Sequence, residues 1–336
     1  MPSQHSSLVV VQKEGLYCPA GDFYIDPWRG VDRALITHGH ADHARRGSNA
    51  YLCSDAGVGI LNARLGDASV EGLAFGAQRK IGEATVSFHP AGHVLGSAQI
   101  RIEVAGEVWV VSGDYKCAPN FVAEDQTCDA FEPVRCHTFV SESTFGLPLY
   151  QWRAQAEIAA QINAWWAANA VAGVTSVIYA YSLGKAQRVL SMVDPSIGPL
   201  FVHSAIAPLN QAYAAAGIVL PAVKKLSDEA LKNAGALVIV PPSGVPQSGF
   251  PARWGDVSDA ITSGWMQLRG ARRRQSVDRG FVLSDHADWP GLLRAISASE
   301  ATSVLVTHGQ VAPLVRHLND QGLDARALAT HFGGEE

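Results

Sequence analysis

The sequence lacks several features that would place it in a specialised class of protein. None of its apolar runs approaches the ~20 residues that a membrane-spanning helix needs, and its N-terminus has no basic segment followed by an apolar stretch of signal length. Its five cysteines contain no CxxC pair, which argues against a disulfide framework and against a thiolate zinc site. We therefore expect a soluble, cytoplasmic protein with reduced cysteines that does not bind a membrane.

The sequence also lacks an excess of positive charge. Its formal net charge is −5, so an overall positive field cannot attract nucleic acid, although a local basic groove could still do so. We find no internal repeat, low-complexity tract or long linker in it. What it has is 336 residues with 47% hydrophobic content, enough for one large folded domain or two ordinary ones.

Short β-type runs separated by Gly and Pro dominate the first part of the chain, and several alternate apolar and polar residues as half-buried strands do. In this part we predict strands at residues 8–11, 34–37, 84–88, 99–104 and 108–112. From Trp152 onward, Ala-rich helical sequence precedes a strand at 175–181 and a helix that opens near Lys185, which is the order of an α/β unit. Further strands are predicted at 199–202 and 236–240.

The last part of the chain repeats the design of the first. After a basic stretch from Arg269 to Arg279, the apolar runs 281–284 and 303–307 each lead towards a histidine. The sequence therefore predicts three segments, 1–150, 151–268 and 269–336, in which the third returns to the domain of the first.

Metal-capable side chains are dense in the run His38-x-His40-x-Asp42-His43, which follows a predicted strand. Zinc prefers His nitrogen and carboxylate oxygen, and a catalytic zinc keeps one position open for water. A His-rich polar loop is the alternative, but the spacing lets a single turn direct these side chains to two ions. The run therefore predicts a metal centre.

Two later motifs complete the ligand count that two metal ions require. His93 lies in the segment Pro90-Ala-Gly-His-Val-Leu-Gly-Ser97, and Asp114 ends the segment Ser112-Gly-Asp114. Both follow predicted strands, where active-site groups are commonly presented. Alone, each would be an ordinary histidine or turn carboxylate.

The ordered motifs HxHxDH, AGH and SGD resemble those of the metallo-β-lactamase superfamily, whose fold is a four-layered αβ/βα sandwich. The resemblance implies two metal ions, one bound by His38, His40 and His93 and the other by Asp42 and His43, with Asp114 bridging them. It also implies that Asp26, in Tyr-Ile-Asp-Pro, supports the metal-binding loop without touching the metal.

Three further motifs resemble motifs A, B and C of the nucleic-acid-processing β-CASP branch of that superfamily: SESTFG with Glu142, SDHAD with His286 and VTHG with His308. By this resemblance His308 binds the second metal, and His286, held by Glu142, donates a proton to the leaving group. The catalytic candidates are Asp42, Glu142 and His286. The segment 180–188 matches the domain inserted in that branch, so the implied fold is α/β, a metallo-β-lactamase sandwich with an inserted β-CASP α/β domain at 151–268.

Within the branch, the segments GLYCPAGDFYIDPW, CHTFVSESTFGLP, GWMQLRGARRR and VDRGFVLSDHADWPGLL are similar to the bacterial DNA-ligase-associated exonucleases. This implies a DNA exonuclease in DNA repair, associated with DNA ligase and helicase, in which hydroxide activated by two Zn²⁺ ions attacks the phosphodiester. Mn²⁺ could occupy the same oxygen- and nitrogen-rich site. His308 is shared with RNA-processing members of the branch, so an RNA-processing endonuclease or 5′-exonuclease is the alternative.

Phosphate contacts are expected from basic and hydroxyl side chains. Lys185 and Arg188 open a predicted helix, where free backbone N–H groups also attract phosphate. The remaining candidates are Arg272, Arg273 and Arg274, in the basic stretch before His286, and Ser182 and Ser243, in predicted turns. A solvated basic loop is the alternative for the arginines. The sequence around Lys185 lacks the earlier glycine and the following Ser/Thr of a P-loop, which excludes an ATPase site of that type.

Overall fold

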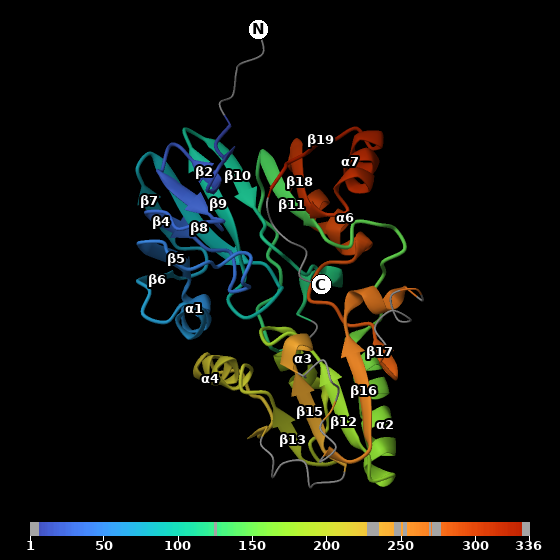
Figure 1. Ribbon diagram of the computed structural model, residues 1–336. Coiled ribbons are helices and arrows are strands. Elements are labelled where there is room, and N and C mark those ends of the chain that lie inside the picture. Colours follow the sequence, from blue (N-terminus) through green and yellow to red (C-terminus); the bar gives the residue numbers. More distant parts are fainter. Residues whose placement is uncertain are drawn as a thin grey trace. The chain divides into compact units, whose positions relative to one another are not determined.

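The computed structural model describes residues 7–123, 126–226, 235–244, 250, 254–268, 270 and 277–330. Its chain forms two compact units, each described by itself below (Figure 1). Unit 1 takes the described residues up to 123, then 128–151, and then those from 286 onward. Unit 2 takes residues 126–127 and the described residues of 152–285.

Two sheets form the centre of unit 1. The first contains, in spatial order, β1 (Val10–Gln12), β2 (Gly15–Cys18), β3 (Phe23–Ile25), β4 (Arg33–Leu35), β5 (Ala50–Ser54) and β6 (Val70–Leu73). The second contains, in spatial order, β19 (Asp324–Ala327), β18 (Ser303–Gly309), β11 (Thr138–Ser143), β10 (Glu107–Val111), β9 (Ala98–Val104), β8 (Ala84–Pro90) and β7 (Gln78–Ile81). Figure 1 shows β18 beside β11, although the two strands lie far apart in the sequence.

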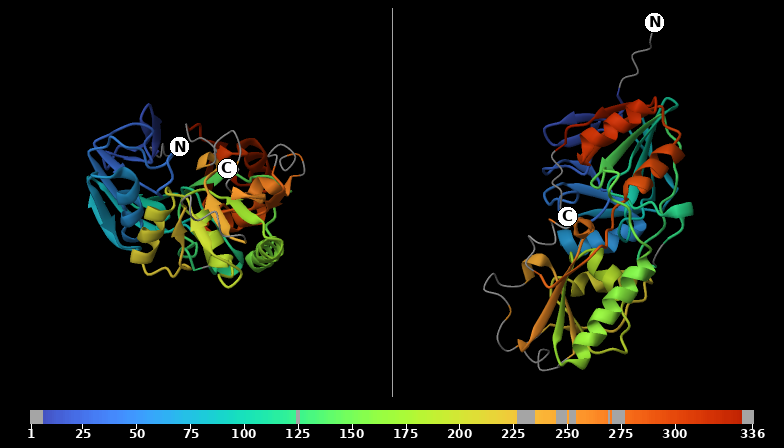
Figure 2. Two further views of the ribbon diagram at one scale, coloured as in Figure 1. Left: turned by 60° about the horizontal axis from the view of Figure 1, so that its bottom comes forward. Right: turned by 90° about the vertical axis from the view of Figure 1, so that its right-hand side faces the viewer.

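The two sheets pack against each other through their apolar faces. One buried cluster joins Phe23 and Leu35 of the first sheet to Phe88 and Ile100 of the second. Helix α1 (Val58–Leu65) packs on the outer face of the first sheet through Leu61. The helices α6 (Trp289–Ala298) and α7 (Val311–Asp320) cover the outer face of the second, as Figure 2 also shows. Unit 1 therefore has the layers helix, sheet, sheet and helix.

Strand direction brings the carboxyl ends of several strands to one edge in each sheet. In the second sheet, β10 runs parallel to β11 and β11 parallel to β18. In the first sheet, β3 runs parallel to β4. Because neighbouring parallel strands end at the same edge, the residues that follow them lie close together, and such edges commonly bind ligands. The fold therefore gathers loops that are distant in sequence.

The described residues of unit 2 form one sheet, in which every pair of neighbouring strands is parallel. Its spatial order is β14 (Lys224–Lys225), β13 (Leu200–Val202), β15 (Leu237–Val240), β12 (Thr175–Tyr179), β16 (Val257–Thr262) and β17 (Arg279–Phe281). A buried cluster on one face includes side chains of α2 (Gln155–Val171) and α3 (Lys185–Met192), and α4 (Ala207–Ala215) is a further α-helix of this unit. None of the described helices has both the length and the apolar character to cross a membrane.

The boundary between the last two segments differs from the one expected at 268/269. The strand β17 pairs with β16 in the sheet of unit 2, and the chain enters unit 1 only at His286. The apolar run 281–284 suggested a strand that continues towards the histidine, yet the ladder ends at Phe281, opposite Thr262. The length of a strand ladder depends on where the neighbouring strand ends. An apolar run in one strand does not show this. The assignment of the units to named domain types stays a prediction.

Candidate metal centre

The first group of candidate ligands lies on the loop that follows β4. Its tight turn is closed by hydrogen bonds from Ala44 N to His40 O (2.8 Å) and from His43 N to His40 O (3.2 Å). Asp26 braces this loop: its carboxylate accepts from Thr37 N (2.8 Å) and from Thr37 Oγ1 (2.5 Å), and it holds His43 Nδ1 at 2.8 Å. Holding one ring nitrogen in this way fixes the orientation of the other nitrogen.

His93 and Asp114 come from loops of the second sheet. The loop between β8 and β9 is closed by a hydrogen bond from His93 N to Ser97 Oγ (3.0 Å). Asp114 follows β10 after Gly113, which has φ +57° and no room for a Cβ, since one would lie 2.6 Å from Thr37 Oγ1. Glycine at this position therefore allows the Asp114 loop and the loop after β4 to approach closely.

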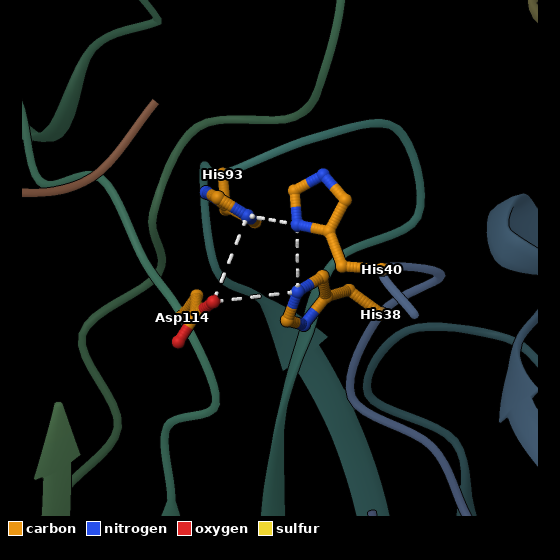
Figure 3. Close-up of side chains that lie close together, drawn as sticks. All are labelled: His38, His40, His93 and Asp114. Carbon is orange, nitrogen blue, oxygen red and sulfur yellow. Dashed lines mark hydrogen bonds and ion pairs between the residues drawn. The ribbon is translucent and has the colours of Figure 1, made fainter. Parts of the chain in front are cut away.

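Four donor atoms converge on one point, as Figure 3 shows for His38, His40, His93 and Asp114. His40 Nδ1 lies 3.1 Å from both His38 Nε2 and His93 Nε2, while Asp114 Oδ2 lies 3.4 Å from His38 Nε2 and 4.0 Å from His93 Nε2. A tetrahedron with zinc–nitrogen distances of about 2.0–2.1 Å has edges of about 3.3–3.4 Å. The donor set and its spacing therefore fit a zinc ion.

A second group consists of Asp42, His43 and His308, and Asp114 of the first group lies beside it. His43 Nε2 lies 3.4 Å from Asp114 Oδ2 and 3.5 Å from Asp42 Oδ2, and His308 completes the group. Among the described residues, the buried atoms Asp42 Oδ1 and His308 Nδ1 have no hydrogen-bond partner. Buried polar atoms are normally satisfied, so these unpartnered donors and acceptors fit a site for a cation and its bound water.

The position of His308 depends on an unusual backbone conformation. It has φ +57°, and the neighbouring Gly309 has φ +79°. Its carbonyl accepts a hydrogen bond from Ser143 Oγ at 2.5 Å, which ties the end of β18 to β11. Such a conformation costs free energy for a residue with a side chain, and it persists only where the surroundings enforce it.

The protonation of this centre follows from burial and mutual charge. Burial lowers the pKa of His38 well below its usual range, with the nearby His43 adding to the effect. Burial alone would raise the pKa of Asp114, but His43 outweighs it and holds that pKa well below its usual range. A neutral imidazole and an ionised carboxylate are the forms that bind metal ions.

The pKa of His43 is shifted in the opposite direction from that of His38. Burial opposes its charged form, but Asp114, Asp42 and Asp26 outweigh burial and hold the pKa of His43 well above its usual range. In the absence of metal, this ring carries the proton that partly balances the surrounding carboxylates.

Glu142 and His286 form a pair beside this centre. His286 Nδ1 lies 2.9 Å from Glu142 Oε2, and both side chains are buried. Glu142 also accepts from Tyr115 N (2.7 Å) and from Thr144 Oγ1. A ligand atom of His286 lies within 4.8 Å of one from Asp114 and one from Glu142. The geometry leaves Nε2 as the ring nitrogen that Glu142 does not hold.

The residues that the sequence suggested as substrate contacts lie either in unit 2 or outside the described residues. Lys185 and Arg188 lie on α3 with buried side chains, each paired with Asp285. Ser182 is half-buried after β12, and Ser243 is exposed after β15. The arginines Arg272, Arg273 and Arg274 lie outside the described residues. The roles proposed for these residues stay predictions.

Several supporting residues were not expected from the sequence. Thr37 contacts Asp26 and, through Oγ1, lies 3.1 Å from His38 Nδ1. Thr144 donates to Glu142, and Ser97 accepts from His93 N. Hydroxyl residues are common in loops, so only their adjacency to the ligand motifs could have marked them.

Comparison with known proteins gives two sequence relatives and also structural neighbours. No model of a protein family matches the chain. Over 318 residues, 94% of this chain, the sequence is 31% identical to Probable DNA ligase of Opitutus terrae, and the match covers 30% of that protein. Over 128 residues, 37% of this chain, it is 28% identical to Endoribonuclease ysh-1 of Neurospora crassa, covering 14% of it. The chain thus spans less than a third of the length of these relatives.

One structural neighbour is a protein of unknown function from Enterococcus faecalis V583. Its crystal structure matches 90% of this chain and 80% of its own with a TM-score of 0.58 and 13% sequence identity. At this level of identity the likeness shows a shared fold. The buried His/Asp clusters are suited to metal ions, and together with these relationships they support a metal-dependent hydrolase.

Proposed function

We propose that this chain is a two-metal nuclease of the metallo-β-lactamase superfamily, β-CASP branch, that hydrolyses phosphodiester bonds. The observation that carries the proposal is the sharing of Asp114 Oδ2, which lies 3.4 Å from His38 Nε2 in one ligand group and 3.4 Å from His43 Nε2 in the other. The helix–sheet–sheet–helix layers of unit 1 fit the αβ/βα sandwich of that superfamily. Unit 2 would be the inserted β-CASP domain.

The ligands divide between two ions, for which zinc fits the donor chemistry and manganese is the second choice. His38, His40, His93 and Asp114 would hold one, and Asp42, His43 and His308 the other, with Asp114 as the carboxylate that would reach both ions. When bound, two such ions supply Lewis acidity, which makes hydroxide available near neutral pH and neutralises charge on the phosphoryl oxygens.

The protein itself contributes to bond cleavage by positioning a side chain that donates a proton. Glu142 holds His286 through Nδ1, and Thr144 and Tyr115 N hold Glu142 in turn. His286 Nε2 would then carry the proton to the leaving oxygen, a step that contributes ~10²- to 10⁴-fold in enzymes that use it. Asp26 keeps His43 in the orientation that ligation requires.

The substrate we propose is DNA, cut from an end during repair in association with DNA ligase and helicase. Support comes from the resemblance to ligase-associated exonucleases and from the relative named Probable DNA ligase, which matches nearly the whole chain. RNA is the second candidate, because another relative is named an endoribonuclease and because His308 is shared with RNA-processing members of the branch.

End-labelled DNA and RNA strands of equal sequence, each with free or blocked ends, distinguish these substrates. The proposal predicts that the zinc-loaded protein degrades DNA with a free end and that Asp42→Ala abolishes this activity. Asp67→Asn, on an exposed residue of the same unit, is the control and should keep it. Preferential cleavage of RNA, or cleavage of strands with both ends blocked, would replace the DNA exonuclease with the second candidate. Full activity of Asp42→Ala would overturn the two-metal mechanism itself.

A further inference from the structure

The strand β18, which carries His308, does not keep a regular register with its neighbour β11. The last regular pair joins Ser141 to Val306, and the next pair joins Ser143 to Gly309. Between these pairs β11 advances two residues, from 141 to 143, while β18 advances three, from 306 to 309. The strand β18 therefore contains one extra residue, a β-bulge, at the position of His308.

The bulge changes the direction in which the His308 side chain points. Side chains two residues apart in a regular strand lie on the same face of the sheet. Val304 and Val306 pack into the cluster that contains α6 and α7, so a regular strand would direct His308 to this helix-covered face. Instead, His308 lines a small pocket with His43 and Val140, and Val140 belongs to the cluster between the two sheets. The extra residue thus redirects the His308 side chain, as bulges beside active sites commonly do.

The side chain of Ser143 closes this bulge from the neighbouring strand. Its hydroxyl donates to His308 O at 2.5 Å and lies 3.2 Å from Thr307 O. Its own carbonyl accepts from Gln310 N at 2.7 Å. Ser143 is 0% exposed, so water cannot easily replace these hydrogen bonds. Ser143 therefore contacts the backbone before, at and after His308.

The left-handed backbone of the bulge depends on close approach of the two strands. Both His308 and Gly309 have positive φ, and a Cβ on Gly309 would overlap Thr144 Cα. Glycine at position 309 thus lets β18 come near enough for the hydroxyl of Ser143 to reach His308 O. The hydrogen bond from Ser143 stabilises the one residue of the bulge whose side chain makes this conformation costly.

We propose that Ser143 is a positioning residue that directs His308 towards Asp42 and His43 by holding the bulge of β18. The proposal rests on the proposed function, because it concerns the second metal site, and all these residues belong to unit 1. Asp26 holds His43 through Nδ1, whereas Nδ1 of His308 has no hydrogen-bond partner among the described residues. No contact at this ring atom fixes the direction of His308, so the backbone that Ser143 holds has to do so.

Titration of the metal-free protein with zinc tests the proposal without relying on activity. The binding step that is lost in His308→Ala identifies the second site. We expect Ser143→Ala to weaken this step by about tenfold or more and to leave the other step within about twofold, as for residues that orient metal ligands. Ser299→Ala is the control, since it removes a buried hydroxyl of unit 1 that belongs to neither ligand group, and it should change neither step. An unchanged second step in folded Ser143→Ala, or an equal loss at both steps, would overturn the proposal.

The His308→Ala background separates positioning from a general effect on the fold. Adding Ser143→Ala to it should not weaken the remaining step, and a further loss there would count against the proposal. Ser143→Cys keeps the size of the side chain with a much weaker donor, so it serves if Ser143→Ala fails to fold, and it should weaken the second step in the same way. If the wild type binds two zinc ions but cleaves no phosphodiester, the proposed function fails while the titration still decides the role of Ser143.

Discussion

Asp114 joins the two ligand groups, because its Oδ2 lies within 3.4 Å of a histidine nitrogen in each. The other ligands belong to one group only. His93 contributes to the first group and His308 to the second. Substitution at single positions should therefore separate the two metal sites.

We expect His308→Ala to bind about one zinc ion per chain fewer than the wild type, because it removes a ligand from the second group alone. Asp114→Ala should reduce the occupancy of both sites. Elemental analysis after dialysis against limiting zinc measures this directly. His317→Ala, outside both groups, is the control. Equal zinc content in His308→Ala and the wild type would show that His308 is not a ligand.

The raised pKa of His43 predicts how metal binding depends on pH. Its pKa in the folded, metal-free protein lies well above the usual range, so the ring is protonated near pH 7 and a metal ion must displace that proton. Zinc binding should therefore release a proton near pH 7, and the release should diminish as pH rises through the raised pKa. Below this pKa the bound proton also stabilises the metal-free fold, and this contribution is lost at higher pH.

Calorimetric titration of the metal-free protein with zinc, in buffers of different ionisation enthalpy, measures the number of protons released. Asp26→Asn removes one of the carboxylates that raise the pKa of His43, so it should release fewer protons at the same pH. The same proton count in Asp26→Asn and the wild type would assign the displaced proton to another group.

Among the loops, the approach of the Asp114 loop to the loop after β4 depends on Gly113. An alanine there would place its Cβ 2.6 Å from Thr37 Oγ1, at φ +57°. We expect Gly113→Ala to lose about 1–3 kcal/mol of stability and also to lose zinc affinity, because Thr37 lies in the loop that carries the candidate ligands His38 and His40. Thermal unfolding and zinc titration check the two effects.

Gly106 offers a matched control for this substitution. It has φ +87° in the turn between β9 and β10, and a Cβ there would meet nothing within 4 Å. Gly106→Ala should therefore be strained by its backbone alone and should keep the zinc affinity of the wild type. If both alanine variants bind zinc as tightly as the wild type, the close approach at Gly113 is not needed for the metal centre.

The closeness of the candidate ligands in the loop after β4 could be predicted from the sequence because these residues are local. His38, His40, Asp42 and His43 lie in one short run, so a single turn brings them together. Strand ends were less predictable. The end of β17 depends on its pairing with β16, and the apolar run 281–284 continues past the last pair. Composition within a run does not reveal where a neighbouring strand stops.

The buried cations were the least predictable feature. Lys and Arg are usually exposed, so Lys185 and Arg188 at a helix opening indicated phosphate contacts. Their partner Asp285 lies almost a hundred residues further along the chain, and only the fold of unit 2 brings it to α3. Contacts between distant residues of this kind follow from topology, which a single sequence leaves open.

The candidate ligands and the pair formed by Glu142 and His286 come from separate parts of the chain. Asp42 lies in the first sheet's loops, Glu142 in β11 and His308 in β18, and the return of the chain at His286 brings the last segment to the same unit. A site of this kind exists only when unit 1 is complete. Its chemistry is therefore a property of the folded unit rather than of any one motif.

The two ligand groups form one hydrolytic centre only if Asp114 serves both, and the substitution Asp114→Asn tests this claim. The substitution keeps the size of the side chain and removes the shared carboxylate charge. Rates of cleavage of end-labelled DNA are measured for zinc-loaded wild type, Asp114→Asn and the exposed control Asp67→Asn. We predict that Asp114→Asn loses activity by about 10²-fold or more while Asp67→Asn keeps the wild-type rate. Wild-type activity in folded Asp114→Asn would contradict the claim.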